Sequence, residues 1–432
     1  MEGKRQYIVS DKIICCLPYQ ISRKQGVKSV QLSGFTPSFH LDSPGKIDYD
    51  KCNQFYARPG GQTGVCVKNI SIMIKPASSL CNMRCRYCFY ADITNLRQVR
   101  SYGIMSRETT EKILENIRSG LQRGDQINFA FQGGEPALAG LDFYRHFVNL
   151  VEGWDKSIKV NYALQTNGLS LDEQWCRFLA RHHFLVGISL DILPACHDEA
   201  RKDEKGQGTY QRVMDGVRLM EQHGVEYNVL CTLTREAAKY PQKIWKAITK
   251  QDFKWVQFTP CLGELSGEED NSYALTPQDF ASFYIQLFSC WLDDFHKGAY
   301  RSIKLIDDLV NYLAYQIPTS CGINGKCQPQ LIVEADGSVF PCDFYCLDEY
   351  LLGNFREQSL EELFLLSVKS EMRSRERSLI CEKCPYEKIC GGGCKRMQKE
   401  VYCGAGDGSC GMRSFLDYSL DKLQEIARQA VR

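Results

Sequence analysis

Residues 78–90 read SSLCNMRCRYCFY, and gaps of three and then two residues separate three cysteines, Cys81, Cys85 and Cys88. This spacing allows one loop to present three thiolates to a single face of an iron–sulfur cubane. Because four Cys thiolates usually hold a 4Fe–4S cluster, three ligands leave one iron open. A structural zinc site is the alternative, but it prefers four closed ligands built from CxxC pairs, and no His or fourth Cys is close in the sequence. The spacing favours a cluster.

The composition limits the class of protein. With 432 residues, the chain is long enough for one large domain and a second module. It has 53 Lys and Arg against 52 Asp and Glu, and the net charge of +1 gives no support for a nucleic-acid partner or a polybasic membrane tether. The sequence has no secretory signal and no apolar run of about 18 residues. We therefore expect a soluble, cytoplasmic protein with no nucleic-acid or membrane partner.

The chain contains 22 cysteines. In a secreted protein they would form disulfides, but in a large chain without a signal they indicate metal ligands or redox groups. Eleven of them fall in two motif regions, which supports ligand roles. The other eleven, such as Cys176 and Cys231, mostly fit a place in the core, and we assign them no functional role.

Short β-branched or aromatic runs alternate with helical segments from residue 69 onward, which is the pattern of βα units. In the helix expected at Ser106–Leu121, apolar residues repeat on one face and Ser106 is placed as the N-cap. Six βα units predict an incomplete parallel barrel, which binds ligands at the C-terminal ends of its strands. The Cys81 loop follows the first strand directly. The predicted strands are Ile70–Ile74, Ile127–Phe131, Ile158–Leu164, Phe184–Leu190, Val225–Leu233 and Trp255–Thr259.

The chain divides into four expected segments. Residues 1–66 carry scattered Gly, Ser and Pro without a long amphipathic helix, and form an N-terminal extension of unknown role. The barrel covers 67–310 and includes a helix that starts at Thr276, where a cap residue precedes Pro277 and an early acid. Turns, Gly and Cys dominate after Ile317, so we expect a cysteine-rich domain over 311–415 and a C-terminal helix over 416–432.

A second group of eight cysteines lies in the C-terminal region. Eight thiolates can hold two fully ligated 4Fe–4S clusters or two zinc ions. A zinc site remains an alternative, because CxxC pairs on glycine-rich loops are common in zinc ribbons. The first cysteine motif favours iron–sulfur clusters over zinc here, because a reductive centre needs a route for electrons. The glycines at 391–393 would allow close backbone approach to sulfides. The eight are Cys321, Cys327, Cys342, Cys381, Cys384, Cys390, Cys394 and Cys410.

With both cysteine groups, the chain resembles the radical S-adenosylmethionine (SAM) superfamily in its twin-cluster SPASM branch, and within that branch the anaerobic sulfatase-maturating enzymes. The three-cysteine motif identifies only the superfamily, whereas FQGGEP at 131–136 with PCDFY at 341–345 is far narrower. The resemblance implies an α/β fold, in which a partial (β/α)6 parallel barrel precedes a cysteine-rich SPASM domain with two auxiliary clusters. Other matching segments are IKPASSLC at 74–81, CFYAD at 88–92, SYGIM at 101–105 and LQTNG at 164–168.

The resemblance implies a SAM site on the first cluster. Cys81, Cys85 and Cys88 would hold this cluster, which binds SAM through its amino and carboxylate groups. The turn Gly133-Gly134-Glu135 would receive the ammonium, which needs carbonyl and carboxylate acceptors. Taken alone, the two glycines also fit an ordinary turn. Further positions that match SAM contacts are Tyr87, Ser189, Arg201 and Leu262.

The resemblance also assigns two auxiliary clusters, so that the chain would carry three 4Fe–4S clusters. Asp343 matches the family's proton acceptor, and its place beside Cys342 would let a substrate proton and an electron leave by neighbouring routes. A lone Asp would otherwise be a solvated turn residue. Tyr90 and Gln132 match residues of the substrate pocket, although each also fits a packing role. The ligand sets are Cys321, Cys327, Cys342 and Cys394, and Cys381, Cys384, Cys390 and Cys410.

The implied reaction is a radical oxidation of a peptide. One electron from a low-potential donor of the flavodoxin or ferredoxin type would cleave SAM to methionine and a 5′-deoxyadenosyl radical. The radical would take a hydrogen atom from the β carbon of a Cys or Ser in a peptide or unfolded sulfatase. Asp343 would accept the thiol or hydroxyl proton while the auxiliary clusters remove the second electron. The product would be Cα-formylglycine, the sulfatase cofactor residue.

Two departures from the family pattern keep other hypotheses open. After the fourth predicted strand the chain reads LDILP at 190–194, where the family has Met-Asp-Gly-Pro, and residues 1–66 have no counterpart in the shorter members. The alternative enzyme is a SPASM maturase that forms a thioether or carbon–carbon crosslink in a ribosomally made peptide. A third hypothesis is a non-enzymatic zinc-ribbon scaffold.

Overall fold

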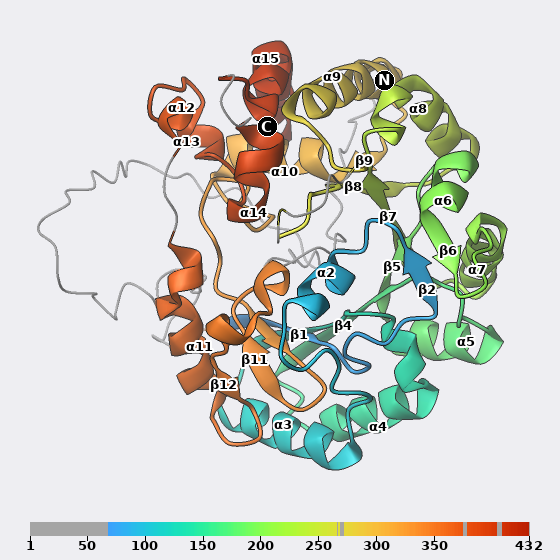
Figure 1. Cartoon of the computed structure of the whole chain (residues 1–432), viewed down its shortest axis with the longest axis vertical. Coiled ribbons are helices and arrows are strands. Elements are labelled where there is room, and N and C mark those ends of the chain that lie inside the picture. Colours follow the sequence, from blue (N-terminus) through green and yellow to red (C-terminus); the bar gives the residue numbers. More distant parts are fainter. Residues whose placement is uncertain (1–67, 266, 268–271, 375–377, 404–407, 432) are drawn as a thin grey trace, which may run out of the picture.

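The computed structural model contains the six strands that the sequence predicts. It describes residues 68–265, 267, 272–374, 378–403 and 408–431. The six strands run parallel and form a partial barrel, which confirms the predicted fold class (Figure 1). In their order across the sheet they are β1 (Asn69–Ile74), β3 (Gln126–Phe131), β4 (Lys159–Thr166), β5 (Leu185–Ser189), β7 (Glu226–Leu233) and β8 (Trp255–Pro260).

Helices cover the outer face of the barrel (Figure 1). Ser106 is the N-cap of α3, and its side chain accepts a hydrogen bond from Thr109 N, as the sequence predicts. Helix α9 begins with a capping box between Thr276 and Asp279, which the sequence also predicts in part. The helices along the barrel are α3 (Arg107–Ser119), α4 (Leu141–Glu152), α5 (Glu173–Arg181), α6 (Pro194–Ala200), α7 (Tyr210–Gln222), α8 (Pro241–Lys250), α9 (Pro277–His296) and α10 (Lys304–Tyr315).

Successive side chains of each strand point alternately toward the helices and toward the barrel interior, which separates the packed core from that interior. In β3, Phe129 and Phe131 are buried in the core, and the ring centroids of Phe131 and Phe147 of α4 lie 5.0 Å apart. Asn128 and Gln132 belong to the alternate set and line a cavity inside the barrel. The strands therefore bury an apolar outer face under the helices and present amide side chains inward.

The cysteine-rich region continues the barrel sheet. β10 (Leu331–Val333) pairs in parallel with β1, and the antiparallel strands β11 (Ser338–Phe340) and β12 (Gly353–Asn354) extend this edge. At the other edge β9 (Ser302–Ile303) pairs with β8, which gives a sheet of ten described strands. The sequence pattern did not reveal these short strands. The strand before the first cysteine loop is therefore hydrogen-bonded to the region that carries the second cysteine group (Figure 1).

Short helices connect the remaining cysteines, and a long helix ends the chain. The last helix, α15, packs against α9 and α10. Among the residues described, no helix combines the length and the apolar character that a membrane span requires. The expected N-terminal extension, residues 1–66, lies outside the described residues. The helices of this region are α11 (Leu360–Lys369), α12 (Leu379–Glu382), α13 (Glu387–Cys390), α14 (Lys395–Met397) and α15 (Gly411–Val431).

The turn after β3 fixes the loop after β1. Gly134 N–H donates to Ser78 O at 2.9 Å, and Glu135 N–H donates to Leu80 O at 2.7 Å. A β carbon at Gly134 would lie only 2.2 Å from Leu80 O, so glycine is required for this close approach. The two segments together hold the Cys81 loop at the C-terminal edge of the barrel.

Replacing Gly134 by Ala should push the Cys81 loop away from this turn. Because overpacking of this kind costs about 1–3 kcal/mol, we expect a lower thermal midpoint and less iron bound after anaerobic reconstitution. Gly153→Ala is the matched control, since its β carbon would meet no atom nearer than 3.3 Å and its φ is −73°. Equal midpoints and equal iron content in the two variants would show that the close contact is unimportant.

Candidate active site

One cavity collects most of the predicted site residues at the C-terminal ends of the barrel strands. Its empty volume, which includes space open to solvent, is about 1000 Å³. The strand ends are where a parallel barrel binds its ligands. Glu135 and Asp343 are absent from the lining. The predicted residues that line it are Cys81, Cys85, Cys88, Tyr87, Tyr90, Gln132, Gly133, Gly134, Ser189, Arg201 and Leu262.

The three thiols of the first motif are neighbours on the wall of this cavity. Burial raises the pKa of Cys81 to about 11 and the pKa of Cys85 to about 12, and the charge of Cys88 adds to both shifts. Asn167 Nδ2 lies 3.8 Å from Cys81 Sγ and can donate to it. Metal ligation requires thiolates, so iron is the kind of partner that would stabilise three neighbouring, partly buried sulfurs. The donor set fits a cluster held by three cysteines.

Glu135 lies behind the glycine turn rather than on the cavity surface. Its carboxylate accepts hydrogen bonds from Ala137 N at 3.0 Å, Thr166 Oγ1 at 2.7 Å and Asn167 N at 2.7 Å. The residue is 1% exposed, and burial raises the pKa of Glu135 although the three hydrogen bonds oppose this shift. Glu135 therefore ties the segment after β3 to the end of β4.

Arg201 and Tyr87 meet at Asp191, a buried carboxylate that the sequence analysis did not assign. Asp191 Oδ2 accepts from Tyr87 Oη at 2.5 Å and from Arg201 Nε at 3.2 Å. Arg201 also lies over the Tyr87 ring at 5.4 Å from its centroid. Asp191 is the residue of the LDILP stretch that matches the family's Asp, so this signal was present in the sequence. The departure in that turn leaves the carboxylate in place to orient both side chains.

The first cysteine loop is also held by a small second sheet. Its strands are antiparallel, and they place Cys85 opposite Arg201. This pairing brings a predicted cluster ligand and a predicted SAM contact into one rigid unit. The strands are β2 (Met83–Cys85) and β6 (Arg201–Asp203).

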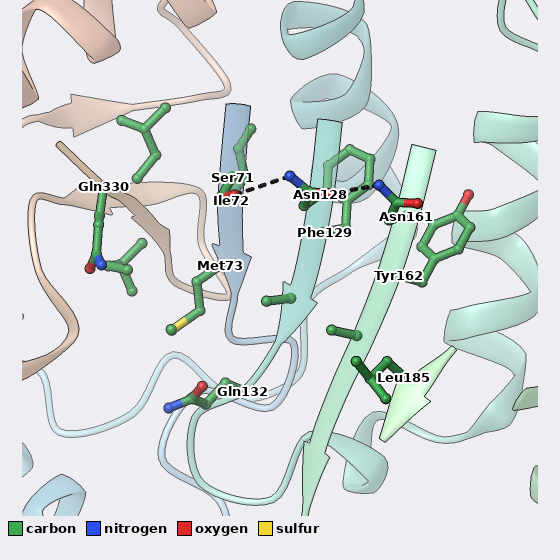
Figure 2. Close-up of a pocket in the computed structure, with 14 residues that line it drawn as sticks. Ser71, Ile72, Met73, Asn128, Phe129, Gln132, Asn161, Tyr162, Leu185 and Gln330 are labelled. Atoms are coloured by element: carbon green, nitrogen blue, oxygen red, sulfur yellow. Dashed lines mark hydrogen bonds between the residues drawn. The ribbon is translucent and has the colours of Figure 1, made fainter. Parts of the chain in front are cut away.

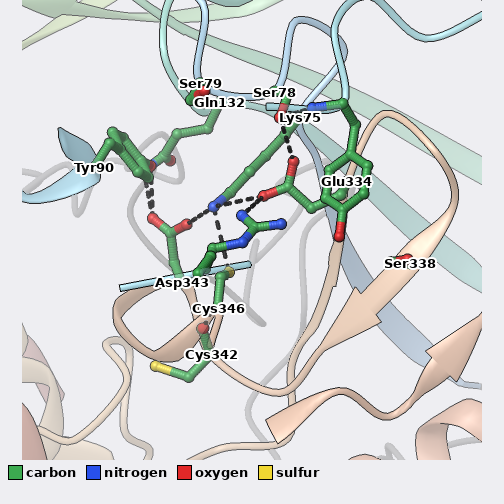
Figure 3. A network of polar contacts seen from close by, with 12 residues as sticks. Lys75, Ser78, Ser79, Tyr90, Gln132, Glu334, Ser338, Cys342, Asp343 and Cys346 are labelled. Atoms are coloured by element: carbon green, nitrogen blue, oxygen red, sulfur yellow. Dashed lines mark hydrogen bonds and ion pairs between the residues drawn. The ribbon is translucent and has the colours of Figure 1, made fainter. Parts of the chain in front are cut away.

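Asp343 directly follows Cys342 and faces two side chains of the cavity wall (Figure 3). Its Oδ2 accepts hydrogen bonds from Tyr90 Oη at 2.6 Å and from Gln132 Nε2 at 3.1 Å. Gln132 Nε2 also donates to Tyr90 Oη at 2.7 Å, so the three polar groups are in mutual contact. Asp343 is 4% exposed. The structure thus brings together three residues that lie far apart in the sequence.

Lys75 supplies the opposite charge in this network (Figure 3). Its Nζ lies 3.0 Å from Asp343 Oδ1 as an ion pair, 3.3 Å from Cys346 Sγ and 3.7 Å from Glu334 Oε1. Arg97 holds the same Glu334 oxygen at 2.7 Å. Burial alone would lower the pKa of Lys75, but the charges of Asp343, Cys346 and Glu334 raise it, so the ammonium stays protonated. Lys75 was not among the predicted site residues, although it lies in the IKPASSLC segment.

The eight C-terminal thiols form two groups. In the first, burial and then the charges of Cys394 and Cys321 raise the pKa of Cys342, so these sulfurs are close together. The charge of Cys327 likewise raises the pKa of Cys321. A β carbon at Gly322 would lie 2.8 Å from Cys394 Cα, which shows how closely the two loops approach. In the described part of the chain, no three His, Cys, Asp or Glu side chains are arranged to chelate a single metal ion.

The second group consists of Cys381, Cys384, Cys390 and Cys410. Burial raises the pKa of Cys390 to about 12, and the charges of the other three thiols add to the shift. Gln398 Nε2 is buried beside them and has no hydrogen-bond partner among the described residues. A β carbon at Gly392 would lie 2.4 Å from this nitrogen and 3.2 Å from Cys381 Sγ. An iron–sulfur cluster fits here, because its sulfurs would accept from such a donor.

A second cavity lies inside the barrel (Figure 2). Its empty volume, again including open space, is about 620 Å³. Asn128 Nδ2 donates to Ser71 Oγ at 3.2 Å, and Asn161 Nδ2 donates to Asn128 Oδ1 at 2.8 Å, so amides form a ladder across the strands. Gln132 borders both cavities, which places the Asp343 network where they meet.

Family models match two segments of the chain, one in the barrel and one in the cysteine-rich region. The model of the radical SAM superfamily matches residues 76–237, and that of an iron–sulfur cluster-binding domain, SPASM, matches residues 325–385. The cysteine-type anaerobic sulfatase-maturating enzyme of Clostridium novyi is 38% identical over 369 residues, covering 84% of this chain and 98% of that enzyme. The serine-type enzyme of Bacteroides thetaiotaomicron is 27% identical over 379 residues, covering 83% and 90%.

Solved structures agree with these relatives. The structure of native anSMEcpe with bound AdoMet is 36% identical, with a TM-score of 0.76, over 83% of this chain and 99% of that one. The same values hold for native anSMEcpe with bound AdoMet and the Kp18Cys peptide. These findings favour a radical SAM oxidoreductase over a zinc-ribbon scaffold, and sulfatase maturation over peptide crosslinking. The chain belongs to the anaerobic sulfatase-maturating enzymes of the radical SAM superfamily.

Proposed function

We propose that the chain oxidises a cysteine of a peptide or unfolded sulfatase to Cα-formylglycine. The observation that carries this proposal is Asp343, a buried carboxylate that adjoins Cys342 and contacts Tyr90 and Gln132 at the cavity wall. In this position, Asp343 would have the substrate pocket on one side and the cysteines of an auxiliary cluster on the other.

The cavity at the strand ends would hold SAM on a 4Fe–4S cluster. Cys81, Cys85 and Cys88 would be the cluster ligands, because they are the neighbouring thiols of its wall. When bound there, SAM supplies a radical that removes a hydrogen atom from the substrate's β carbon.

The cavity wall offers a partner for each part of SAM. Arg201 would face the carboxylate, and Asp191 would keep the guanidinium in place. Glu135 would act indirectly, by fixing the glycine turn that receives the ammonium, because three protein donors already occupy its carboxylate. The remaining contacts would come from Tyr87, Gly133, Gly134, Ser189 and Leu262.

Asp343 would take the thiol proton at Oδ2. Tyr90 and Gln132 hold this oxygen at the cavity wall, and a substrate thiol that displaces one of them can donate to it. Lys75 pairs with Oδ1, so its ammonium holds the carboxylate without occupying Oδ2. The residues of the chain therefore position the acceptor before substrate binds.

The C-terminal thiols would carry the second electron away. We assign one auxiliary 4Fe–4S cluster to Cys321, Cys327, Cys342 and Cys394, and another to Cys381, Cys384, Cys390 and Cys410, for three clusters in all. The grouping of the thiols supports both assignments. A low-potential flavodoxin or ferredoxin in the cytoplasm would be the electron donor, because the first cluster needs an external electron.

The cysteine side chain of the peptide would reach Asp343 beside Gln132, which lines both the strand-end cavity and the smaller cavity inside the barrel. Higher identity to the cysteine-type relative than to the serine-type one supports cysteine as the preferred residue.

The direct test is incubation of the anaerobically reconstituted protein with SAM, a reductant and a Cys-x-Pro-x-Arg peptide. We expect the defined mass loss that converts Cys to formylglycine, and a slower conversion of the matched Ser peptide. A peptide with Ala in place of Cys is the control and should not change. Formation of a crosslink without any aldehyde would favour the alternative maturase instead.

Replacing Asp343 by Asn should separate SAM cleavage from product formation. The variant lacks the proton acceptor, so we expect near-normal 5′-deoxyadenosine but formylglycine reduced by about 10²–10⁴-fold, the usual contribution of a general base. Asp348→Asn is the matched control, because this carboxylate lies in the same region and accepts an exposed hydrogen bond from Gln98 N at 2.8 Å. A full aldehyde yield from the Asp343 variant would refute the assigned role.

A further inference from the structure

Cys403 lies against the second group of C-terminal thiols, although the sequence places it among the eleven core cysteines. Its Sγ lies 3.6 Å from Cys381 Sγ, and the residue is 5% exposed. Cys403 also forms an isolated antiparallel bridge with Cys410. Five thiols, rather than four, therefore converge on this site.

The local backbone explains how Cys403 reaches the group. A π-helical turn over Gln398–Tyr402 precedes it, and Cys403 N–H donates to Gln398 O at 2.6 Å. A π turn adds one residue to the helical repeat and often occurs at functional sites. Here the turn directs residue 403 back toward Cys381, and it places the unpartnered Gln398 amide on the same side.

Cys403 and Cys410 lie beside one another next to the other thiols of this group. The bridge between them puts the two backbones side by side, with Cys410 directly before α15. Cys403 Sγ contacts Cys381 Sγ, so the bridge brings both Cys403 and Cys410 to the same thiol group. This placement makes either thiol a candidate for the fourth position beside the remaining three.

We propose that Cys403 and Cys410 are alternative fourth ligands of the second auxiliary cluster. Exchange requires one Fe–S bond to form as another breaks. The incoming thiol releases its proton and the outgoing thiolate takes one up, so no oxidant or reductant is needed. The cluster would then survive the loss of either thiol. The inference rests on the proposed second cluster but not on the sulfatase reaction.

The test measures iron in Cys403→Ala, Cys410→Ala and the double variant of the full chain after anaerobic reconstitution. We expect each single variant to retain the iron content of the unmodified protein, and the double variant to lose about four irons per chain. Cys384→Ala is the matched control, because the fifth thiol, Cys403, contacts Cys381 and pairs with Cys410 rather than with Cys384, so this variant should lose about four irons alone. Electron paramagnetic resonance of the reduced proteins identifies which cluster is lost.

Three results would overturn the proposal. Loss of about four or more irons in either single variant would show that the remaining thiol does not replace the missing one. Cys410→Ser is made alongside, to test whether a conservative change gives the same loss. Full retention in the double variant would show that neither thiol is a ligand. If Cys384→Ala retained its full iron content, the assignment of a second auxiliary cluster to these thiols would be wrong. Because no peptide is present, these results are separate from failure of the formylglycine assay.

Discussion

The buried ion pair between Lys75 and Asp343 is the interaction on which the site depends. Lys75 directly follows β1 of the barrel, and Asp343 directly follows a thiol of the cysteine-rich region. Burying such charges is costly, and removal of one partner of a buried pair costs about 3–5 kcal/mol. Glu334 and Arg97 extend the network so that both signs of charge are matched. The pairing of β1 with β10 gives the same junction a backbone connection.

In the proposed reaction, this junction would give the proton and the electron neighbouring exits. Asp343 and Cys342 are consecutive residues, so a substrate held at Asp343 would also be close to the first group of C-terminal thiols. SAM would bind on the other side of Tyr90 and Gln132, which line the strand-end cavity. The barrel would then start the oxidation and the C-terminal region would complete it, while the ion pair connects the two parts.

Much of this architecture could be predicted from the sequence, because it rests on local patterns. The apolar runs gave the six barrel strands almost to their ends, and the cysteine spacing with the FQGGEP segment gave the strand-end cavity. The remaining features depend on long-range contacts. Strands β10–β12 are two or three residues long and form a series in which only β10 pairs with β1, while β11 pairs with β10 and β12 with β11. Nothing local marks Lys75 as the partner of Asp343, and Cys403 reads as a core residue until its bridge to Cys410 is seen.

The measurement that tests this account most directly uses a Cys-x-Pro-x-Arg peptide with deuterium on the β carbon of its cysteine. The radical and the base must act on the same side chain, so we expect deuterium in the 5′-deoxyadenosine, in step with formylglycine. Mass spectrometry of both products reports the two events together. Formylglycine accompanied by deuterium-free 5′-deoxyadenosine would contradict the account, because the hydrogen atom would then have left by another route.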